Sequence, residues 1–302
     1  PLSPEIESFI GEMVQKHQFE GDALRRLFGQ AQLRPEILQT ISAPATARPW
    51  HEFRSRNIDA AHINGGAAFW REHAVTLARA SREYGVPEEI IVATIGVESL
   101  YGRNTGSYRV LDALTTLAFQ YPPRAELFRA QLEEYLLLVR ETGFNATRIR
   151  GSYAGAIGIP QFLPSSYRRY AVDFDGDGRR DLMRTTADAI GSIANYYKAH
   201  GWRSGEIVAV PAGVEGAGVD ALLEAGIRPQ LKIAELKRLG VTPVVPLEDE
   251  AEAALFVVET ESGPRYWLGF NNFYVITRYN RSINYALAVY ELAREVRAQF
   301  KP

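Results

Sequence analysis

One glutamate, Glu98, closes an otherwise apolar segment of the sequence. Pro87 followed by two acidic residues is typical of a helix N-terminus, and the run from Ile90 to Val97 that follows is almost entirely apolar. A helix of this composition is expected to be buried on most sides, and Glu98 falls in its last turn. Desolvation and the carbonyl dipoles of the helix C-terminus both disfavour a carboxylate there, so the pattern predicts a raised pKa for Glu98.

A carboxylic acid that stays protonated near neutral pH is suited to general-acid catalysis on a glycosidic oxygen. Ordinary glycosidases pair this acid with a second carboxylate roughly 5–9.5 Å away, and no second acid in the sequence has a comparable setting. A lone acid suffices if the substrate carries its own nucleophile. The alternative is a helix-end glutamate in an ion pair, for example with Arg103, because structural ion pairs also produce unusual carboxylates.

A second segment with chemical potential is residues 151–167, which read GSYAGAIGIPQFLPSSY. Its small residues allow close approach of the backbone to a ligand or to another helix. Gln161 follows Pro160 at a predicted helix start, and its side chain could hydrogen-bond an amide or a hydroxyl group. Glycines serve a tight helix–helix contact equally well, so the segment indicates either a binding loop or close packing.

The segment 173–178 (DFDGDG) has carboxylates at loop positions 1, 3 and 5 and glycine at position 6, which is how an EF-hand calcium loop begins. Position 12 of such a loop is normally glutamate, whereas this chain has Arg184 there. The next acid suited to closing the loop is Asp188. The pattern favours a structural cation over the alternative, an Asp/Gly-rich surface turn.

The elements that must position these residues are mostly helices. Periodicity and helix-end signals predict helices at 3–40, 65–84, 87–101, 110–119, 124–141, 160–171, 186–199, 232–239 and 281–300. Segments rich in β-branched and aromatic residues predict strands at 206–211, 254–260 and 265–277. The fold class is therefore mainly α (α+β), with a small β-containing unit in the C-terminal third.

Composition restricts the function further. The net charge of −2 argues against nucleic-acid binding, which requires a basic surface, and the absence of cysteine excludes thiol chemistry and Cys-type metal sites. No apolar run is long enough to span a membrane, so any targeting segment or lipid anchor is expected upstream of Pro1.

Several strings together closely resemble the B-type lytic murein transglycosylases, glycoside hydrolase family 103. They are GVES at 96–99, GSYAGA at 151–156, IPQFLPSSY at 159–167, NYYKAHGW at 195–202 and FYVITRYNRS at 273–282. The resemblance covers the chain from about Pro49 to the C-terminal helix. It implies a lysozyme-like helical core (85–205), a helical N-terminal domain (1–84) completed by the C-terminal helix (281–302), and a small β-containing unit (206–280) whose end returns to the active-site cleft.

The resemblance also implies roles for individual residues. Glu98 would be the catalytic acid and base, and Ser152 and Gln161 would bind the N-acetyl and hydroxyl groups of the sugars. Arg124 would contact carboxylates of the peptide or lactyl group. The remaining cleft residues would be Tyr196, Tyr279, Asn280, Tyr285 and Phe53.

In two places the sequence departs from the family pattern. Pro123 stands where another arginine is expected, and Phe53 stands where a cleft tyrosine is expected, which puts the peptide contacts and one sugar contact in doubt. For the aspartate loop, the resemblance implies an EF-hand-like calcium site with a structural role. Its ligands would be Asp173, Asp175, Asp177, Asp188 and the carbonyl oxygen of Arg179.

These observations predict a monomeric periplasmic enzyme of the bacterial cell envelope that needs no catalytic cofactor. It would cleave the β-1,4 bond between N-acetylmuramic acid and N-acetylglucosamine in peptidoglycan strands and form 1,6-anhydromuramyl products. Enzymes that build murein are compatible partners. The alternatives are a hydrolytic muramidase of lysozyme type, which needs a second carboxylate near Glu98, and a non-catalytic peptidoglycan-binding protein.

Overall fold

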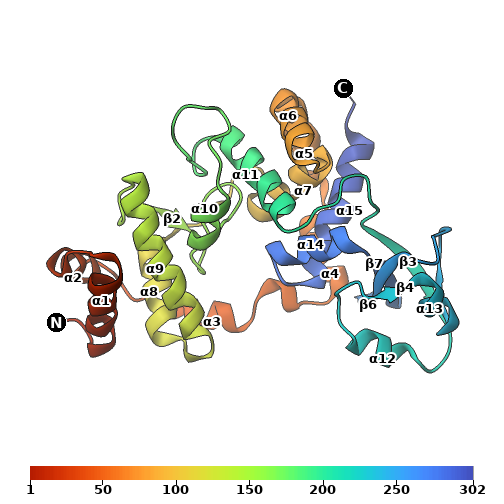
Figure 1. Cartoon of the computed structure of the whole chain (residues 1–302), viewed down its shortest axis with the longest axis horizontal. Helices are drawn as coiled ribbons and strands as arrows, with labels where there is room; N and C mark the ends of the chain where they lie inside the picture. The colour runs from red at the N-terminus through yellow and green to blue at the C-terminus, as the bar shows by residue number, and fades with distance from the viewer. Residues whose placement is uncertain (302) are drawn as a thin grey trace. The chain divides into compact units, whose positions relative to one another are not determined.

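Helical periodicity dominates the chain, and the computed structural model, which describes residues 1–301, is built mainly of helices with two small sheets, of two and five strands (Figure 1). The chain divides into two compact units. Unit 1 comprises Pro1–Pro44 and Gly102–Ser192, and unit 2 comprises Ala45–Tyr101 and Ile193–Pro302. Among the residues described, no helix is long and apolar enough to cross a membrane.

Unit 1 is held together by the packing of two helices, α8 and α9, which both carry buried leucines such as Leu114 and Leu136. The N-terminal helices add an aromatic contact, in which the ring of Phe9 meets those of Phe28 and Phe119 edge-on at 5.9 and 5.8 Å. The elements of this unit are α1 (Pro4–His17), α2 (Gly21–Gly29), α3 (Pro35–Ser42), β1 (Tyr108–Arg109), α8 (Val110–Gln120), η2 (Pro122–Arg124), α9 (Ala125–Thr142), β2 (Arg150–Gly151), α10 (Pro164–Tyr170) and the first half of α11 (Thr186–Ala199).

The helices of unit 2 gather around the C-terminal helix α15, which packs against α4, α5 and α7 (Figure 1). The ring of Trp70 stacks on Phe300 at 4.1 Å just beyond the end of α15. Besides the end of α11, the elements are η1 (Ala45–Ala47), α4 (Trp50–Asn57), α5 (Ala60–Glu72), α6 (Ala74–Tyr84), α7 (Glu88–Ser99), β3 (Ala209–Val214), α12 (Val219–Glu224), β4 (Leu231–Lys232), α13 (Ile233–Arg238), β5 (Val241–Pro243), β6 (Glu252–Thr260), β7 (Gly263–Gly269), α14 (Asn271–Tyr279) and α15 (Ile283–Gln299).

The five-stranded sheet of unit 2 has the order β4-β6-β7-β3-β5, and each neighbouring pair is antiparallel. Strands β6 and β7 form a hairpin that closes at Thr260 and Gly263. A small apolar core, which includes Leu255 and Leu268 from the sheet and Leu236 from α13, lies under it. Helix α14 begins immediately after β7, so the sheet fixes where this helix starts.

The structure corrects several boundaries. Residues 265–277 were expected to be one β-rich segment, yet β7 ends at Gly269 and α14 begins at Asn271. The aromatic and β-branched residues after Gly269 also recur at helical spacing, and burial of Phe273 and Ile276 favours the helix. The segment 3–40 forms three helices, 65–84 is divided at His73, and the helix expected from 160 begins only at Pro164.

The two units cut the chain differently from the three predicted segments, 1–84, 85–205 and 206–280. Residues 1–44 pack with the middle of the chain, because α3 lies on α8, whereas α15 and α7 are partners in unit 2. The three-segment division therefore stays a prediction about domains.

Candidate active site

Glu98 lies in the last turn of α7, whose residues from Ile90 to Gly96 are all buried. Its own side chain keeps some exposure to solvent but is surrounded by protein atoms. Burial raises the pKa of Glu98 from 4.5 to about 7, and the hydroxyl group of Tyr285 opposes this rise. With a pKa of about 7, the Glu98 carboxyl group keeps its proton at pH values where an ordinary glutamate has lost it, in the direction that the sequence predicts.

The Tyr285 hydroxyl is buried and, among the described residues, has no partner that meets strict hydrogen-bond geometry. Tyr285 nevertheless lowers the pKa of Glu98, so its hydroxyl group lies near that carboxyl group. A donor with no other partner is available to a carboxylate that becomes charged during a reaction. Tyr285 thus provides the one polar interaction that favours the ionised form of Glu98.

Three tyrosines from separate helices surround this carboxyl group: Tyr197 on α11, Tyr279 on α14 and Tyr285 on α15. Burial raises the pKa of each phenol, and the negative charge of Glu98 raises it further. The rings of Tyr279 and Tyr285 stack at 6.3 Å, and Tyr197 lies 5.5 Å from Tyr279. The result is an aromatic enclosure that desolvates the acid without placing a second ionised group beside it.

Tyr197 and Thr94 are site residues that the sequence analysis missed. The two hydroxyl groups are 2.8 Å apart, and Thr94, one turn before Glu98, also donates to the carbonyl oxygen of Ile90 at 2.8 Å. Tyr197 follows the predicted residue Tyr196 directly, but on a helix adjacent residues point in different directions. A polar threonine one helical turn before the acid, within an apolar run, was the available signal.

The backbone that ends α7 is unusual. Leu100 and Tyr101 both adopt positive φ angles, 48° and 61°. Their N–H groups donate to the carbonyl oxygens of Gly96 (2.9 Å) and Ile95 (3.3 Å), so the last turn is closed by hydrogen bonds. Left-handed backbone costs a non-glycine residue about 1–2 kcal/mol. Tertiary packing must therefore hold this turn beside Glu98.

The structure brings Tyr196, Tyr279 and Tyr285 together with Glu98 in unit 2. Tyr196 donates to the carbonyl oxygen of Arg278 at 2.7 Å and stacks on His200 at 4.0 Å, so it holds α11 against α14. Tyr279 is partly buried, with its ring against those of Tyr196 and Tyr285.

Two other predicted residues of unit 2 differ sharply in exposure. Asn280 is exposed directly after α14 and is free to meet a ligand from solvent. Phe53 on α4 is only 5% exposed, and this burial argues against a direct sugar contact.

Ser152 and Gln161 belong to unit 1, in a loop closed by short antiparallel bridges. The Ser152 hydroxyl oxygen accepts from the N–H groups of Ala154 (3.2 Å) and Ala156 (3.0 Å), so it shapes the loop while its own proton can still be donated. Gln161 lies before α10 with φ 53°, and its amide nitrogen donates to the carbonyl oxygens of Thr105 and Gly158, both at 2.9 Å. Its amide oxygen remains as an acceptor.

The glycines of this loop serve close packing. A methyl group at Gly155 would lie 2.5 Å from Leu114, and one at Gly151 would come within 2.9 Å of Val110. The close approach that these residues permit is therefore to the protein itself, as the second interpretation of the segment had it. Arg124, also in unit 1, is exposed at the end of η2 with its guanidinium 5.5 Å from the ring centre of Phe128.

The aspartate loop forms a cluster in unit 1. Carboxylate oxygens of Asp173, Asp175, Asp177 and Asp188 all lie within 4.8 Å of one another. Asp188 is fully buried, and its oxygens accept from the N–H groups of Phe174 (2.8 Å) and Asp181 (3.0 Å). Burial raises the pKa of Asp188 and, together with neighbouring carboxyl groups, that of Asp175. Closely spaced oxygen ligands of this kind suit a hard cation such as calcium.

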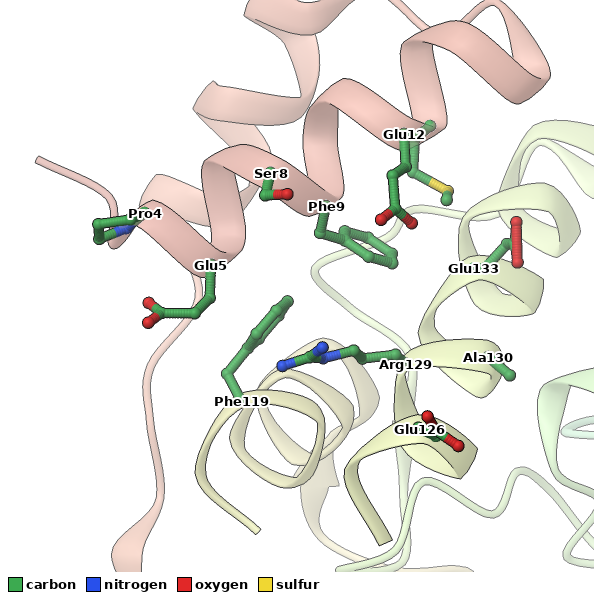
Figure 2. A pocket seen from close by; sticks show the side chains of 11 residues that line it. Pro4, Glu5, Ser8, Phe9, Glu12, Phe119, Glu126, Arg129, Ala130 and Glu133 are labelled. Carbon is green, nitrogen blue, oxygen red and sulfur yellow. The ribbon is translucent and has the colours of Figure 1, made fainter. Parts of the chain in front are cut away.

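Two cavities contain none of the predicted site residues. One of about 530 Å³ lies in unit 1, where Phe9 and Glu12 of α1 face Phe119 and Arg129 (Figure 2). The other, of about 950 Å³, lies in unit 2 around the start of α14. The carboxylates of the first cavity are mostly exposed, so they lack the desolvation that distinguishes Glu98.

Comparison with known proteins gives consistent matches. A family model described as Transglycosylase SLT domain matches residues 2–294. Membrane-bound lytic murein transglycosylase B of Escherichia coli (strain K12) is 42% identical over 304 residues, which cover 97% of this chain and 83% of that protein.

Three solved structures are also similar. Lytic transglycosylase SltB1 of Pseudomonas aeruginosa has a TM-score of 0.92 at 47% identity, covering 99% of this chain and 98% of that chain. The Escherichia coli lytic transglycosylase Slt35 in complex with calcium has a TM-score of 0.87 at 41% identity (98% and 93% covered). SltB3 of Pseudomonas aeruginosa in complex with NAG-anhNAM-pentapeptide has a TM-score of 0.83 at 31% identity (97% and 79% covered).

Replacement of Glu98 by glutamine is expected to stabilise the fold at neutral and alkaline pH. The folded carboxyl has a pKa of about 7 against an ordinary 4.5, so between these values the folded protein keeps a proton that the unfolded chain has lost. The free energy of unfolding of the wild type therefore falls relative to that of Glu98→Gln as the pH rises through this window, by about 3 kcal/mol in total.

Urea unfolding of both proteins at about pH 4, 6 and 8 measures this divergence. Glu12→Gln, on the exposed face of α1, is the matched control and should show none. A difference between wild type and Glu98→Gln that is the same at every pH would contradict the role of burial.

Proposed function

This chain belongs to the transglycosylase SLT domain family and is a lytic transglycosylase, and we propose that Glu98 is its single catalytic acid and base. Its relatives are named lytic murein transglycosylases, so its substrate is murein, the peptidoglycan of the bacterial cell envelope. The expected fold class is confirmed, a mainly helical chain of the lysozyme-like kind with a small antiparallel sheet. A periplasmic location remains part of the proposal.

The observation that carries the proposal is the raised pKa of Glu98, about 7, in a setting with no charged neighbour acting on it. Protonated Glu98 donates its proton to the oxygen that links N-acetylmuramic acid to N-acetylglucosamine. As the bond between that oxygen and the muramyl C1 breaks, positive charge develops at C1. The carboxylate left behind can accept a hydrogen bond from the buried Tyr285 hydroxyl, the group that lowers the pKa of Glu98.

In the second half of the reaction Glu98 acts as a base. It accepts the proton of the muramyl C6 hydroxyl group, and the C6 oxygen bonds to C1 to close a 1,6-anhydro ring. Glu98 is thereby returned to its protonated form, and no water is consumed. Because nucleophile and acceptor belong to one sugar, the attack has the high effective concentration of an intramolecular reaction. A second catalytic carboxylate is unnecessary.

In this proposal each unit, taken by itself, carries groups that suit sugar binding. In unit 2, the half-buried ring of Tyr279 offers a stacking surface and exposed Asn280 offers an amide. In unit 1, Ser152 retains a hydroxyl donor and Gln161 an amide oxygen acceptor, which suit N-acetyl and hydroxyl groups. Arg124 offers an exposed guanidinium for a peptide or lactyl carboxylate.

A hydrolytic muramidase is the second candidate on the same fold. It needs a second carboxylate that acts as a nucleophile or activates water near the acid. Among the described residues, the pKa of Glu98 is shifted by burial and by the Tyr285 hydroxyl, and no carboxylate contributes. This absence favours the anhydro-forming reaction over hydrolysis.

We also propose that the aspartate cluster holds a structural calcium ion. The E. coli relative Slt35 was solved in complex with calcium, and this chain has four carboxylates gathered within 4.8 Å. Asp173, Asp175, Asp177 and Asp188 would supply ligands, together with the carbonyl oxygen of Arg179. The cation would offset the repulsion among these groups and fix the loop to α11, which begins beside it.

Product analysis tests the reaction. Digestion of purified murein by the wild type should yield muramyl ends that are 1,6-anhydro, lighter by one water than hydrolytic ends, as read by mass spectrometry. Glu98→Gln should lower the rate by at least about a thousandfold, because the general acid is lost. Murein binding should persist in that variant, which separates catalysis from binding.

Two outcomes contradict the proposal. Hydrated reducing ends would identify a hydrolase, and unchanged activity of Glu98→Gln would remove Glu98 from the chemistry. Glu89→Gln, at the other end of α7, is the control for a change of charge on the same helix and should retain activity.

Calcium should raise the thermal stability of the protein. Binding only to the folded state adds about 2.7 kcal/mol when free calcium is 100 times its Kd. Asp177→Asn removes one carboxylate of the cluster and should abolish most of this gain, whereas Asp249→Asn, on the exposed surface before β6, should keep it. Scanning calorimetry with calcium and with a chelator measures the shift, and equal gains for wild type and Asp177→Asn would contradict the site.

A further inference from the structure

The side chain of Tyr101 folds back over the helix that carries Glu98. Tyr101 follows the last turn of α7, and its hydroxyl group donates to the carbonyl oxygen of His62, on α5, at 2.6 Å. Its ring lies 5.5 Å from that of Phe69, also on α5. The side chain is thus fixed at both its ring and its hydroxyl, between α5 and the end of α7.

Three glycines make room for this ring. A methyl group at Gly96 on α7 would lie 2.5 Å from the Tyr101 hydroxyl oxygen, and one at Gly66 on α5 would lie 2.6 Å from the same atom. At Gly65 a methyl group would lie 3.0 Å from the ring. Glycine is unfavourable inside a helix, so its use at these positions indicates that the space is needed for the tyrosine.

The ring presses on the turn that contains Glu98. Gly96, which lies against the Tyr101 side chain, is two residues before Glu98, and Leu100 and Tyr101 just after Glu98 both have positive φ angles. Helix ends fray unless something holds them, and this one is closed by strained backbone. The hydrogen bond to His62 and the ring contact with Phe69 are interactions that offset the strain.

We propose that Tyr101 is a positioning residue for catalysis, which holds the last turn of α7 so that the Glu98 carboxyl stays enclosed among Tyr197, Tyr279 and Tyr285. Tyr101 itself does not touch the reacting atoms. The inference rests on the proposed role of Glu98 as acid and base. It concerns a residue on the opposite side of the turn from the tyrosine enclosure.

The groups that face Glu98 and Tyr101 define what a pH measurement would report. Around Glu98 the ionisable groups are the phenols of Tyr197, Tyr279 and Tyr285, whose pKa values are all raised. Around Tyr101 they are Asp59 and His62, whose Oδ1 and Nδ1 atoms are 2.7 Å apart. The bond to Tyr101 uses the His62 backbone carbonyl, so His62→Asn keeps that bond and removes the imidazole.

The experiment measures kcat, KM and their pH dependence on soluble glycan strands for Tyr101→Phe and Tyr101→Leu. Loss of one hydrogen bond in Tyr101→Phe should lower kcat about fivefold with little change in KM. In Tyr101→Leu the turn loses its ring as well, and kcat should fall about a hundredfold. Water then reaches the carboxyl group, so the pKa of Glu98 falls toward its ordinary value. The alkaline limb of the kcat profile should therefore move to lower pH by at least about half a unit.

A substitution at Gly96, which lies against the Tyr101 side chain, provides an independent test. Gly96→Ala should reproduce the loss of kcat, and its effect should shrink in a Tyr101→Leu background, because the clash is with the tyrosine. Gly11→Ala is the matched control in a helix, since a methyl group there meets no atom within 4 Å, and it should leave kcat unchanged.

The outcomes separate the two proposals. Lower thermal stability of the Tyr101 variants with an unchanged kcat and pH profile would overturn the positioning role and leave Glu98 as the acid. An alkaline limb that disappears in His62→Asn would assign it to the imidazole and overturn the inference as well. If Glu98→Gln were fully active, the proposed function itself would fail, whatever the Tyr101 variants show.

Discussion

The structure depends on one costly interaction, the enclosure of the Glu98 carboxyl group at the end of an apolar helix. Taking a carboxylate out of water is unfavourable, and a raised pKa of about 7 records that cost. Phenol rings from α11, α14 and α15, and not charged partners, surround the acid, so the cost of removing it from water is expressed as the raised pKa. In the proposed reaction this raised pKa lets Glu98 hold the proton that the leaving oxygen needs.

This arrangement explains why distant parts of the sequence meet in unit 2. Helix α15 lies against α7 and supplies Tyr285, and the sheet passes directly into α14, which supplies Tyr279. The small sheet therefore has a part in the site although none of its strands carries a catalytic group. In unit 1, the cation proposed for the aspartate cluster would offset the repulsion among its carboxylates and so hold the loop at the start of α11.

Much of this could be predicted from the sequence. The acidic helix start, the apolar run and the terminal Glu98 predicted α7 to within two residues at each end. The helical periodicity of apolar positions predicted most other helices. The strand expected through residues 265–277 was wrong after Gly269, because aromatic and β-branched residues suit either element and only tertiary burial decides between them. Tyr197, Thr94 and Tyr101 were not predicted as site residues, since their roles depend on contacts between elements far apart in the chain.

The central claim is that desolvation keeps Glu98 protonated near neutral pH, and a direct titration of that carboxyl group tests it best. Carbon-13 NMR of protein labelled at the glutamate carboxyl carbons, with Glu98→Gln used to assign the resonance, follows the group through its ionisation. The account predicts a midpoint near pH 7, the value that burial produces. A midpoint close to the ordinary 4.5 would contradict it.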